Sequence, residues 1–523
     1  MRSQENALYQ RALKFLYRRT NYETFKSIPY DQMGRSLKRL REFLTFLGNP
    51  DQHYVVIHVA GTKGKGTVCC ALDRIYRAQG YRVGLFTSPH LVDLTERFQI
   101  DGKNCDKMFF AETLLGLVDR WKEFNAGRKI GAKNGDPADP EYEADKMTFF
   151  EWSLVLAVTL FARAGVDVAI LEVGLGGRYD ATNAVDADLS VLTSVSYDHC
   201  EQLGDSLFGI ASEKLGIVKT NAPLVSGVGF AKRLYHEPVP KPLEEEDEES
   251  LETVEQSPEE KWRLQEQAFL TIDPETQIDE RAIEEVIGLA RATAQKHNAP
   301  FYQLDGISEF VANLPTPPFD SVRKWNFELA LLVVSVLAQR ESYPQGREND
   351  RGSSGRLALP VDEEAILRAA EGFELPARME IICHSPLVVV DGAHNRASVA
   401  ASAQALKERF PGRKIKALFA TTVGKDVRGM IAELAPVVDE VMLTERSNEG
   451  RAVPVSDLIQ TVEQALDETC AEDAPIRSKF RVVPNYRSFL ADYCTSPNQT
   501  GDVLCAIGSF YFAAEVKKEV TSR

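Results

Sequence analysis

The segment "YVVIHVAGTKGKGTVCCALDRIYRAQG", residues 54–80, constrains the fold of this chain most strongly. It opens with a short β-branched apolar run, which is typical of a buried strand. A loop with three glycines follows, and the segment closes with helical spacing of apolar residues that stops at Gly80. A further strand-like run, "YRVGLFTS" (81–88), comes directly after it. This strand–loop–helix–strand order predicts a parallel α/β unit.

The loop of this segment is close to a phosphate-binding loop but spelled differently. The Walker A pattern is G-x-x-x-x-G-K-[ST], whereas the loop here reads Gly61, Thr62, Lys63, Gly64, Lys65, Gly66, Thr67. Glycines let backbone N–H groups approach phosphate oxygens, and a helix N-terminus favours negative charge. Lys65 adds a cation and Thr67 a hydroxyl for a phosphate or its magnesium. A plain glycine-rich turn is the alternative, but the position between strand and helix favours phosphate binding.

Two α/β series follow one another along the chain. The first includes an apolar helix at 148–165 and strands at 166–177 and 187–199. A polar, Gly/Ser-rich stretch at 341–360 then separates it from a second series of strands and helices. We therefore expect two domains, residues 1–343 and 360–523, joined by a linker at 344–359, with the ligand site in a cleft between them.

Composition excludes several classes of protein. The 523 residues carry a net charge of −16, which argues against a nucleic-acid binder. No apolar run is long enough to span a bilayer, and the charged first residues do not form a signal peptide. The eight cysteines are scattered, as expected of free thiols in the cytoplasm. The segments at 128–145 and 231–262, the second of them strongly acidic, are expected to be insertions.

Polar residues follow two strands of the first series. Glu172 ends an apolar strand, where an unpaired carboxylate would be costly, so magnesium ligation is favoured over a capped strand end. His199 follows the next strand, where a metal ligand and a packed histidine remain equally open. Arg178 and Asp180 lie on the glycine-rich loop after Glu172, with a surface ion pair as the alternative. Lys214 alone reads as an exposed helix lysine.

The second series has its own charged group. Asp391 and His394 come just past a buried strand, and Arg378 lies a short way upstream. A strand-end turn is the alternative, because Asp-Gly is a strong turn dipeptide. The functional interpretation is a second set of charged groups that faces the phosphate loop.

Taken together, these stretches resemble the Mur ligase superfamily and, within it, the folylpolyglutamate synthase/dihydrofolate synthase family. They occur in family order and span nearly the whole chain. The matching pieces are "LGNP", "HVAGTKGKGT", "LFTSPHL", "ERFQIDG", "TFFE", "LEVGLGGRYDATN", "SYDH", "EKLGIVK", "DGAHN" and "IGSFYFAAEV".

This resemblance implies a fold and a reaction. The fold is α/β, with an N-terminal P-loop ATPase-type domain on a mostly parallel sheet and a smaller C-terminal Rossmann-like domain. ATP would phosphorylate a carboxylate of a pteroate or folate, and the amino group of L-glutamate would attack the acyl phosphate. Two magnesium ions would neutralise charge around the transferring group. A monomeric enzyme without nucleic-acid or membrane partners is expected.

The resemblance also assigns roles to single residues. Lys65 and the loop glycines would hold the β and γ phosphates; Ser88 and Glu172 would bind one magnesium and His199 the second. Lys214 matches a lysine that is carbamylated in this family, which turns an ammonium into an anionic oxygen ligand. The remaining assignments are Asn326 to adenine, Arg378 and Asp391 to the nucleotide, His394 and Ser509 to the incoming glutamate, and Asp180, with Arg178 beside it, to the pterin.

Several positions depart from the family pattern. Lys63 stands for an asparagine common in bacterial members, Thr67 for serine, Tyr179 for leucine and Ala377 for glycine. The His-Gln that normally precedes Asn326 is absent. "GGRYDATN" and "DGAHN" resemble bacterial enzymes that use both dihydropteroate and folates, so we predict a bifunctional enzyme. A monofunctional synthase is the alternative; a peptidoglycan Mur ligase and a non-catalytic nucleotide-binding module fit less well.

Overall fold

A computed structural model describes most of the chain. The described residues are 2–19, 33–127, 147–198, 200–204, 206–229, 280–315, 319–339, 358–447, 452–469, 478–495 and 501–522. The two expected insertions, His199 and most of the expected linker at 344–359 lie outside them. The chain divides into two compact units. Unit 1 lies within 1–230, 280–311 and 325–371, and unit 2 has its described residues within 312–324 and 372–522.

Unit 1 is built on an eight-stranded sheet with the strand order β4-β3-β2-β5-β1-β6-β7-β8. The strands are β1 (Val55–Ala60), β2 (Val83–Phe86), β3 (Phe98–Ile100), β4 (Lys103–Asn104), β5 (Val168–Glu172), β6 (Leu189–Leu192), β7 (Leu224–Ser226) and β8 (Phe301–Gln303). Neighbours from β2 to β8 pair in parallel, and β3 and β4 add an antiparallel edge. The four strands β1, β2, β5 and β6 are buried throughout, which is why their sequences are mostly apolar.

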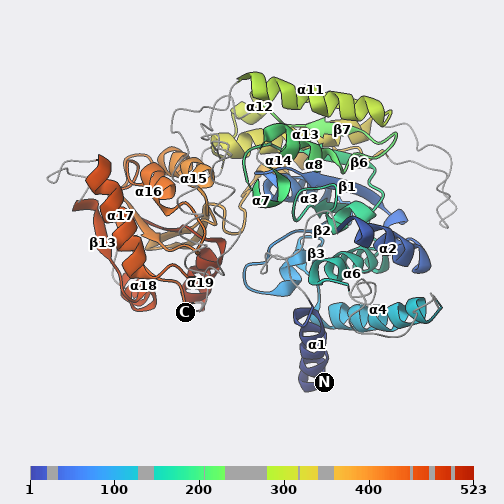
Figure 1. Cartoon of the computed structure of the whole chain (residues 1–523), viewed down its shortest axis with the longest axis horizontal. Coiled ribbons are helices and arrows are strands. Elements are labelled where there is room, and N and C mark those ends of the chain that lie inside the picture. The colour runs from blue at the N-terminus through green and yellow to red at the C-terminus, as the bar shows by residue number, and fades with distance from the viewer. Residues whose placement is uncertain are drawn as a thin grey trace, which may run out of the picture. The chain divides into compact units, whose positions relative to one another are not determined.

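Helices cover both faces of this sheet. The helices of this unit are α1 (Arg2–Tyr17), α2 (Met33–Phe46), α3 (Lys65–Ala78), α4 (Lys107–Gly127), α6 (Phe149–Ala164), α7 (Cys200–Leu203), α8 (Leu207–Leu215), α11 (Glu280–Lys296), α12 (Glu309–Ala312), α13 (Ser321–Ala338), whose first turn belongs to unit 2, and α14 (Glu363–Ala370). In Figure 1, α11 lies on one side of the sheet and α6 with α4 on the other. The apolar α6 begins at a Thr148–Glu151 capping box and ends at Gly165, so its limits follow from its cap residues.

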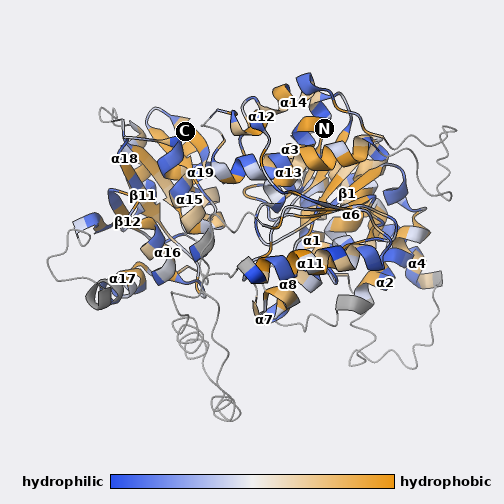
Figure 2. Cartoon of the chain, turned by 90° about the horizontal axis from the view of Figure 1, so that it is seen from above, coloured by the Kyte–Doolittle hydropathy of each residue, from blue (hydrophilic) through white to orange (hydrophobic). Residues whose placement is uncertain are grey.

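Unit 2 holds a six-stranded sheet with the order β13-β12-β11-β14-β10-β9. Its strands are β9 (Glu380–His384), β10 (Leu387–Val390), β11 (Ile415–Phe419), β12 (Glu440–Leu443), β13 (Phe480–Val482) and β14 (Val503–Ile507). Its helices are α15 (Arg396–Arg409), α16 (Val427–Leu434), α17 (Val455–Thr469), α18 (Tyr486–Thr495) and α19 (Phe510–Thr521). Only the edge strand β9 runs antiparallel to its neighbour. Figure 2 shows the apolar strands β11 and β12 of this sheet.

The predicted fold class is confirmed. The strand–loop–helix–strand unit at 54–88 and the apolar helix after Thr148 form as expected. Both sheets are mostly parallel, each with an antiparallel edge that the sequence did not reveal. Among the described residues, no helix is both long and apolar enough to span a bilayer. The seven cysteines within these ranges are all free thiols.

Candidate functional site

The glycine loop joins the end of β1 to the start of α3, and two of its glycines are required by geometry. Gly61 has φ 153° and Gly64 has φ 83°. A Cβ at Gly61 would lie 1.9 Å from Thr193 Oγ1, and one at Gly64 would lie 2.4 Å from Asn326 Oδ1. Both positions therefore exclude a side chain by contact as well as by backbone conformation. The second contact also places Asn326, on α13, directly beside the loop.

The segment that follows β6 holds this loop in place. Thr62 N donates to Ser194 O at 2.8 Å, and Thr62 Oγ1 accepts from Ser196 N at 3.1 Å. Lys63 N donates to Ser194 Oγ at 2.9 Å, while Lys63 O accepts from Thr193 Oγ1 at 2.6 Å. Because β1 and β6 are parallel neighbours, the loop after one strand is bonded to the loop after the other. The loop is therefore rigidly shaped by its neighbour.

Three lysines lie in or beside the loop: Lys63 and Lys65 belong to it, and Lys214 comes from α8. Lys65 Nζ donates to Gly61 O at 3.0 Å, and Lys214 Nζ donates to the same oxygen at 3.2 Å. Lys63 forms an ion pair with Asp198, with Nζ and Oδ2 2.9 Å apart. Loop N–H groups, a helix N-terminus and cations together form an arrangement that suits a polyphosphate anion.

Lys214 is buried, with 4% of its surface exposed, so the interpretation as an exposed helix lysine is wrong. Sequence spacing missed this because α8 packs its last turn under the loop, where the chain offers Gly61 O as a partner. Burial, together with the charges of Lys65 and Lys63 and against the opposing charge of Asp198, lowers the pKa of Lys214 to about 7. An amine with such a pKa is partly neutral at physiological pH and can act as a nucleophile.

Glu172 and Ser88 meet beside the start of α3. Glu172 is the last residue of β5 and only 6% exposed, and its Oε2 accepts from Ser88 N at 3.1 Å. A Cβ at Gly66 would lie 3.6 Å from Glu172 Oε1, so the carboxylate borders the phosphate-type loop. A carboxylate and a hydroxyl fit a hard cation such as Mg²⁺. Within the described ranges, no three His, Cys, Asp or Glu side chains form a metal-binding cluster.

Asp180 and Arg178, on the loop after β5, have different surroundings. Asp180 is buried; its Oδ2 accepts from Gly174 N (3.1 Å) and Leu175 N (3.0 Å), and its Oδ1 accepts from Thr182 N (3.0 Å). Burial raises the pKa of Asp180, and these hydrogen bonds oppose the rise. Arg178 does not pair with Asp180; its Nε donates to Glu213 Oε1 on α8 at 3.1 Å. Asp180 thus shapes its loop, and Arg178 ties that loop to α8.

Two bases in unit 1, the buried His58 and the half-buried Lys219, were not singled out by the sequence. His58, in the middle of β1, lies with Nε2 2.8 Å from Thr182 Oγ1, and burial lowers its pKa to about 3. Lys219 Nζ donates to Asn183 O and Oδ1, both at 2.8 Å, and burial lowers its pKa to about 8. His58 gave no signal inside an apolar strand, whereas Lys219 is the last residue of the quoted "EKLGIVK".

In unit 2, the predicted residues lie after two neighbouring parallel strands. Asp391 and His394 follow β10, and Ser509 precedes α19 after β14. Gly508 N donates to Ala393 O at 3.1 Å, which joins the two loops. Asp391 and Ser509 are buried, whereas His394 is half-buried and its Nδ1 lies 3.0 Å from Gly392 O.

Arg378 lies on a loop of unusual backbone conformation. Its side chain is exposed, while its neighbours Ala377 and Met379 are buried. Ala377 has φ 47° and Met379 has φ 49°, which is the left-handed region that favours glycine. This explains physically why glycine is usual at the position that Ala377 occupies.

The structure thus gathers the predicted residues in two groups, one in each unit. In unit 1, the loop 61–67, Ser88, Glu172, Lys214 and Asn326 meet around the start of α3, with Arg178 and Asp180 on the adjoining loop. In unit 2, Arg378, Asp391, His394 and Ser509 lie on connected loops. His199 lies outside the described residues.

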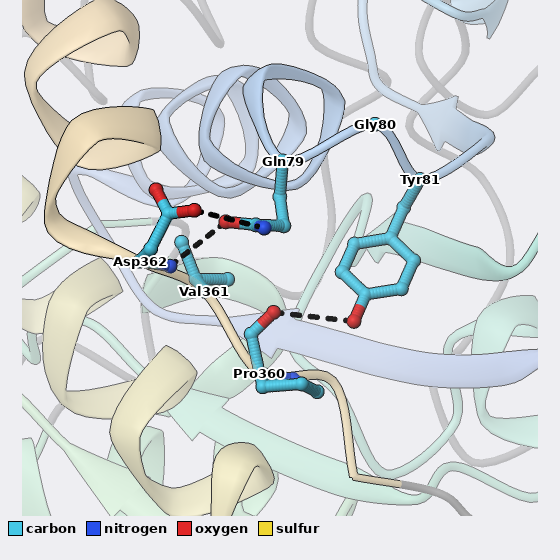
Figure 3. A pocket seen from close by; sticks show the side chains of 6 residues that line it. All are labelled: Gln79, Gly80, Tyr81, Pro360, Val361 and Asp362. Carbon is cyan, nitrogen blue, oxygen red and sulfur yellow. Dashed lines mark hydrogen bonds between the residues drawn. The ribbon is translucent and has the colours of Figure 1, made fainter.

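A separate pocket of about 380 Å³ lies at the other end of α3. It is lined by Gln79, Gly80, Tyr81, Pro360, Val361 and Asp362. Figure 3 shows that its walls are tied to each other, since Tyr81 Oη donates to Pro360 O at 3.1 Å and Gln79 Nε2 donates to Asp362 Oδ2 at 3.2 Å. Because α3 is 14 residues long, about 20 Å separates the pocket from the glycine loop. We assign the pocket no part in the chemistry.

The sequence of this chain is similar to those of known ligases. A family model described as "Mur ligase, glutamate ligase domain" matches residues 377–510. The dihydrofolate synthase/folylpolyglutamate synthase of Mycobacterium tuberculosis is 30% identical over 497 residues, 92% of this chain and 88% of that protein. The protein of the same name from Escherichia coli is 31% identical over 385 residues, 74% of this chain and 71% of that protein.

Solved structures agree on the fold. The folylpolyglutamate synthase of M. tuberculosis complexed with ADP superposes with a TM-score of 0.67 at 24% identity, covering 99% of both chains. The bifunctional folylpolyglutamate synthase/dihydrofolate synthase of Yersinia pestis, complexed with AMPPNP and a manganese ion, gives 0.63 at 24% identity and covers 93% of both chains. The sequence relatives show that the chain belongs to the folylpolyglutamate synthase/dihydrofolate synthase family of ATP-dependent, amide-forming ligases.

Proposed function

We propose that this chain adds L-glutamate both to dihydropteroate and to reduced folates, using ATP and Mg²⁺ and passing through an acyl phosphate. The observation that carries the proposal is the meeting of Glu172 and Ser88 with the glycine loop and its lysines. A carboxylate is a poor electrophile until one of its oxygens becomes a phosphate leaving group. A site for that chemistry needs a polyphosphate cradle next to oxygen ligands for a hard cation.

The proposal gives each part of unit 1 a task. The N–H groups at the start of α3 and Lys65 bind the β and γ phosphates, with Gly61, Thr62, Lys63, Gly64, Gly66 and Thr67 as the surrounding loop. Glu172 and Ser88 are suited to hold a magnesium ion, which would neutralise phosphate charge. His199 is assigned to a second magnesium and Asn326 to adenine.

Lys214 is proposed to bind metal as a carbamate. An ammonium cannot ligate a cation, whereas a neutral amine that adds CO₂ and releases a proton becomes an anionic oxygen ligand. Burial of Lys214 and its bond to a carbonyl rather than to a carboxylate support this proposal. The modification would also remove a buried positive charge that Lys65 and Lys63 disfavour.

In unit 2, the proposal assigns Arg378 and Asp391 to the nucleotide and His394 and Ser509 to L-glutamate. Asp391 acts mainly through position, because its carboxylate accepts from Met379 N (2.7 Å), Ala393 N (2.9 Å) and Ser402 Oγ (2.8 Å). Asp180 is assigned to the pterin, with Arg178 holding the same loop on α8. The enzyme is proposed to act as a cytoplasmic monomer.

An assay of purified protein with both acceptors tests the proposal. Release of ADP should require L-glutamate, Mg²⁺ and either dihydropteroate or tetrahydrofolate, and mass spectrometry should show one added glutamyl group per turnover. Turnover of tetrahydrofolate alone would reduce the chain to a monofunctional synthase. Turnover of neither acceptor, with success on a UDP-muramoyl substrate, would overturn the assignment.

A variant of Asp180 tests whether this residue binds the pterin substrate or only shapes its own loop. Asp180→Asn keeps the side-chain size but leaves fewer acceptors for the N–H groups of Gly174, Leu175 and Thr182. We expect turnover of dihydropteroate to fall more than ATP affinity does. Equal losses of both, together with a lower melting temperature, would assign Asp180 to loop structure alone.

A further inference from the structure

The loop that carries Arg378 is bonded at every backbone polar atom from residue 377 to residue 379. Ala377 N donates to Glu380 Oε2 (2.9 Å), Ala377 O accepts from Gly392 N (2.8 Å), Arg378 N donates to Leu375 O (3.2 Å), Arg378 O accepts from Arg323 Nη2, Met379 N donates to Asp391 Oδ2 (2.7 Å), and Met379 O accepts from Arg409 Nη1 (2.6 Å). An exposed arginine is therefore mounted on a fully fixed backbone.

Two of these bonds come from buried arginines on different helices. Arg323 lies in the first turn of α13 and Arg409 in the last turn of α15, exposed by 4% and 3%. Arg323 also donates to Phe373 O at 3.3 Å and lies 3.6 Å from Asp320 Oδ2. The carbonyl oxygens of Arg378 and Met379 thus each accept a hydrogen bond from a guanidinium.

Burying these two arginines costs free energy, so general stability alone does not explain their presence. A buried charge loses its hydration, which only well-placed partners offset. Within the described part of the chain, Arg409 Nε and Nη2 are buried without a hydrogen-bond partner. Its short bond to Met379 O is accordingly the directed contact that the structure retains for it.

The backbone that these arginines fix is strained. A non-glycine residue in the left-handed region costs about 1–2 kcal/mol, and both Ala377 and Met379 adopt it. Such strain persists only where the surroundings over-determine it, and it concentrates at functional positions.

We propose that Arg323 and Arg409 are positioning residues that hold the peptide groups beside Arg378, so that its exposed guanidinium is presented in one orientation to the anionic nucleotide. This inference rests on the proposed function, because it takes the ligand of Arg378 to be ATP. The arginines act through the backbone, and neither touches the ligand.

A double-mutant cycle tests this inference. Arg409→Met should lower kcat/KM for ATP about tenfold in the otherwise native chain. In an Arg378→Ala background the same change should cost less than about twofold, because there is no longer a guanidinium to aim. Arg409→Lys, which retains one donor for Met379 O, should restore part of the loss. Arg413→Met, an exposed arginine in the same unit, is the matched control and should behave as native.

The outcomes are distinct. Equal losses with and without Arg378, or a lower melting temperature with unchanged kinetics, would overturn the inference and leave the arginines a structural role. If Arg409→Met does not fold, Arg323→Gln supplies the same cycle with a smaller change. The same cycle is read a second time as the ATP dissociation constant, measured without acceptor. A native chain that binds ATP but uses neither acceptor would fail the proposed function, and this second readout would still test the inference.

Discussion

The glycine loop of unit 1 and the Arg378 loop of unit 2 solve one problem in two ways. Both need positive φ angles, at Gly61 and Gly64 in the first and at Ala377 and Met379 in the second. The first loop obtains them from glycine, which adopts them without steric cost. The second uses side chains that disfavour them and is held by hydrogen bonds from buried residues. A backbone conformation can thus be specified by residue type or imposed by the tertiary structure.

Adding a methyl group at Gly61 should disrupt the glycine loop, and this is the largest effect that we expect. In Gly61→Ala the new Cβ would lie 1.9 Å from Thr193 Oγ1, so the loop must move away from the segment that shapes it. A displacement of about 1 Å in a binding loop lowers turnover by about 100-fold. ATP affinity and kcat are the measurements.

Gly80→Ala is the matched control for this prediction. Gly80 also has a positive φ of 98°, but a Cβ there meets nothing within 4 Å. The control should lose about 1 kcal/mol of stability from strain alone and keep its ATP affinity. Equal behaviour of the two variants would show that contact with Thr193 does not govern the loop.

Low pH should destabilise unit 1 through the buried His58 in β1. The strands of unit 2 that the structure describes bury no histidine, so they offer no such group. The pKa of His58 falls from 6.5 to about 3 on burial. Between these values the unfolded chain binds a proton that the folded chain does not, so stability is lost as pH falls. From about pH 6.5 to about pH 4 the loss is about 3 kcal/mol. Denaturant unfolding at both pH values should show a smaller drop for His58→Gln than for the native chain.

Removing one hydrogen-bonding oxygen should weaken the imposed conformation of unit 2. Asp391→Asn retains the shape of the side chain, but its amide nitrogen cannot accept from Met379 N or from Ala393 N. An unsatisfied buried donor costs about 1–3 kcal/mol. Calorimetry should show a lower melting temperature for this variant, and an unchanged one would mean that the carboxylate does not fix the loop.

Placing a glycine in the Arg378 loop, as in the loop of unit 1, should have the smallest effect. Ala377→Gly relieves a left-handed alanine and should raise the free energy of unfolding by about 0.5–1 kcal/mol, net of the added freedom of the unfolded chain. Denaturant titration measures the change. A decrease would mean that the hydrogen bonds to the backbone of this loop already offset the strain at Ala377.

The strands and helices that carry the motifs could be predicted because their signals are local. Continuous apolar runs identified β1, β5 and β10, and cap residues limited α6. The antiparallel edges were not predicted, because β3 and β4 have only three and two residues and β9 is only half-buried, so their apolar pattern is weak. The residues of the candidate site in unit 1 were found through a specific family spelling, and their meeting around α3 agrees with it.

What the sequence could not reveal depends on contacts between distant segments. Lys214 was interpreted as exposed because helical spacing does not show which face a neighbouring loop covers. Arg323 and Arg409 carried no signal, since a charged residue in a helix is ordinarily solvated. Asp180 was predicted to contact substrate, and its hydrogen bonds to Gly174 and Thr182 depend on a loop conformation that sequence spacing does not specify.

One oxygen atom, Gly61 O, receives the ammonium groups of both Lys65 and Lys214. The charge of Lys65 helps to lower the pKa of Lys214, so the two amines are not a pair of permanent cations. The half-buried Lys65 and the buried Lys214 are therefore already held at the glycine loop before any anion binds. The free-energy cost of partly dehydrating these two side chains is therefore met during folding instead of during each catalytic cycle.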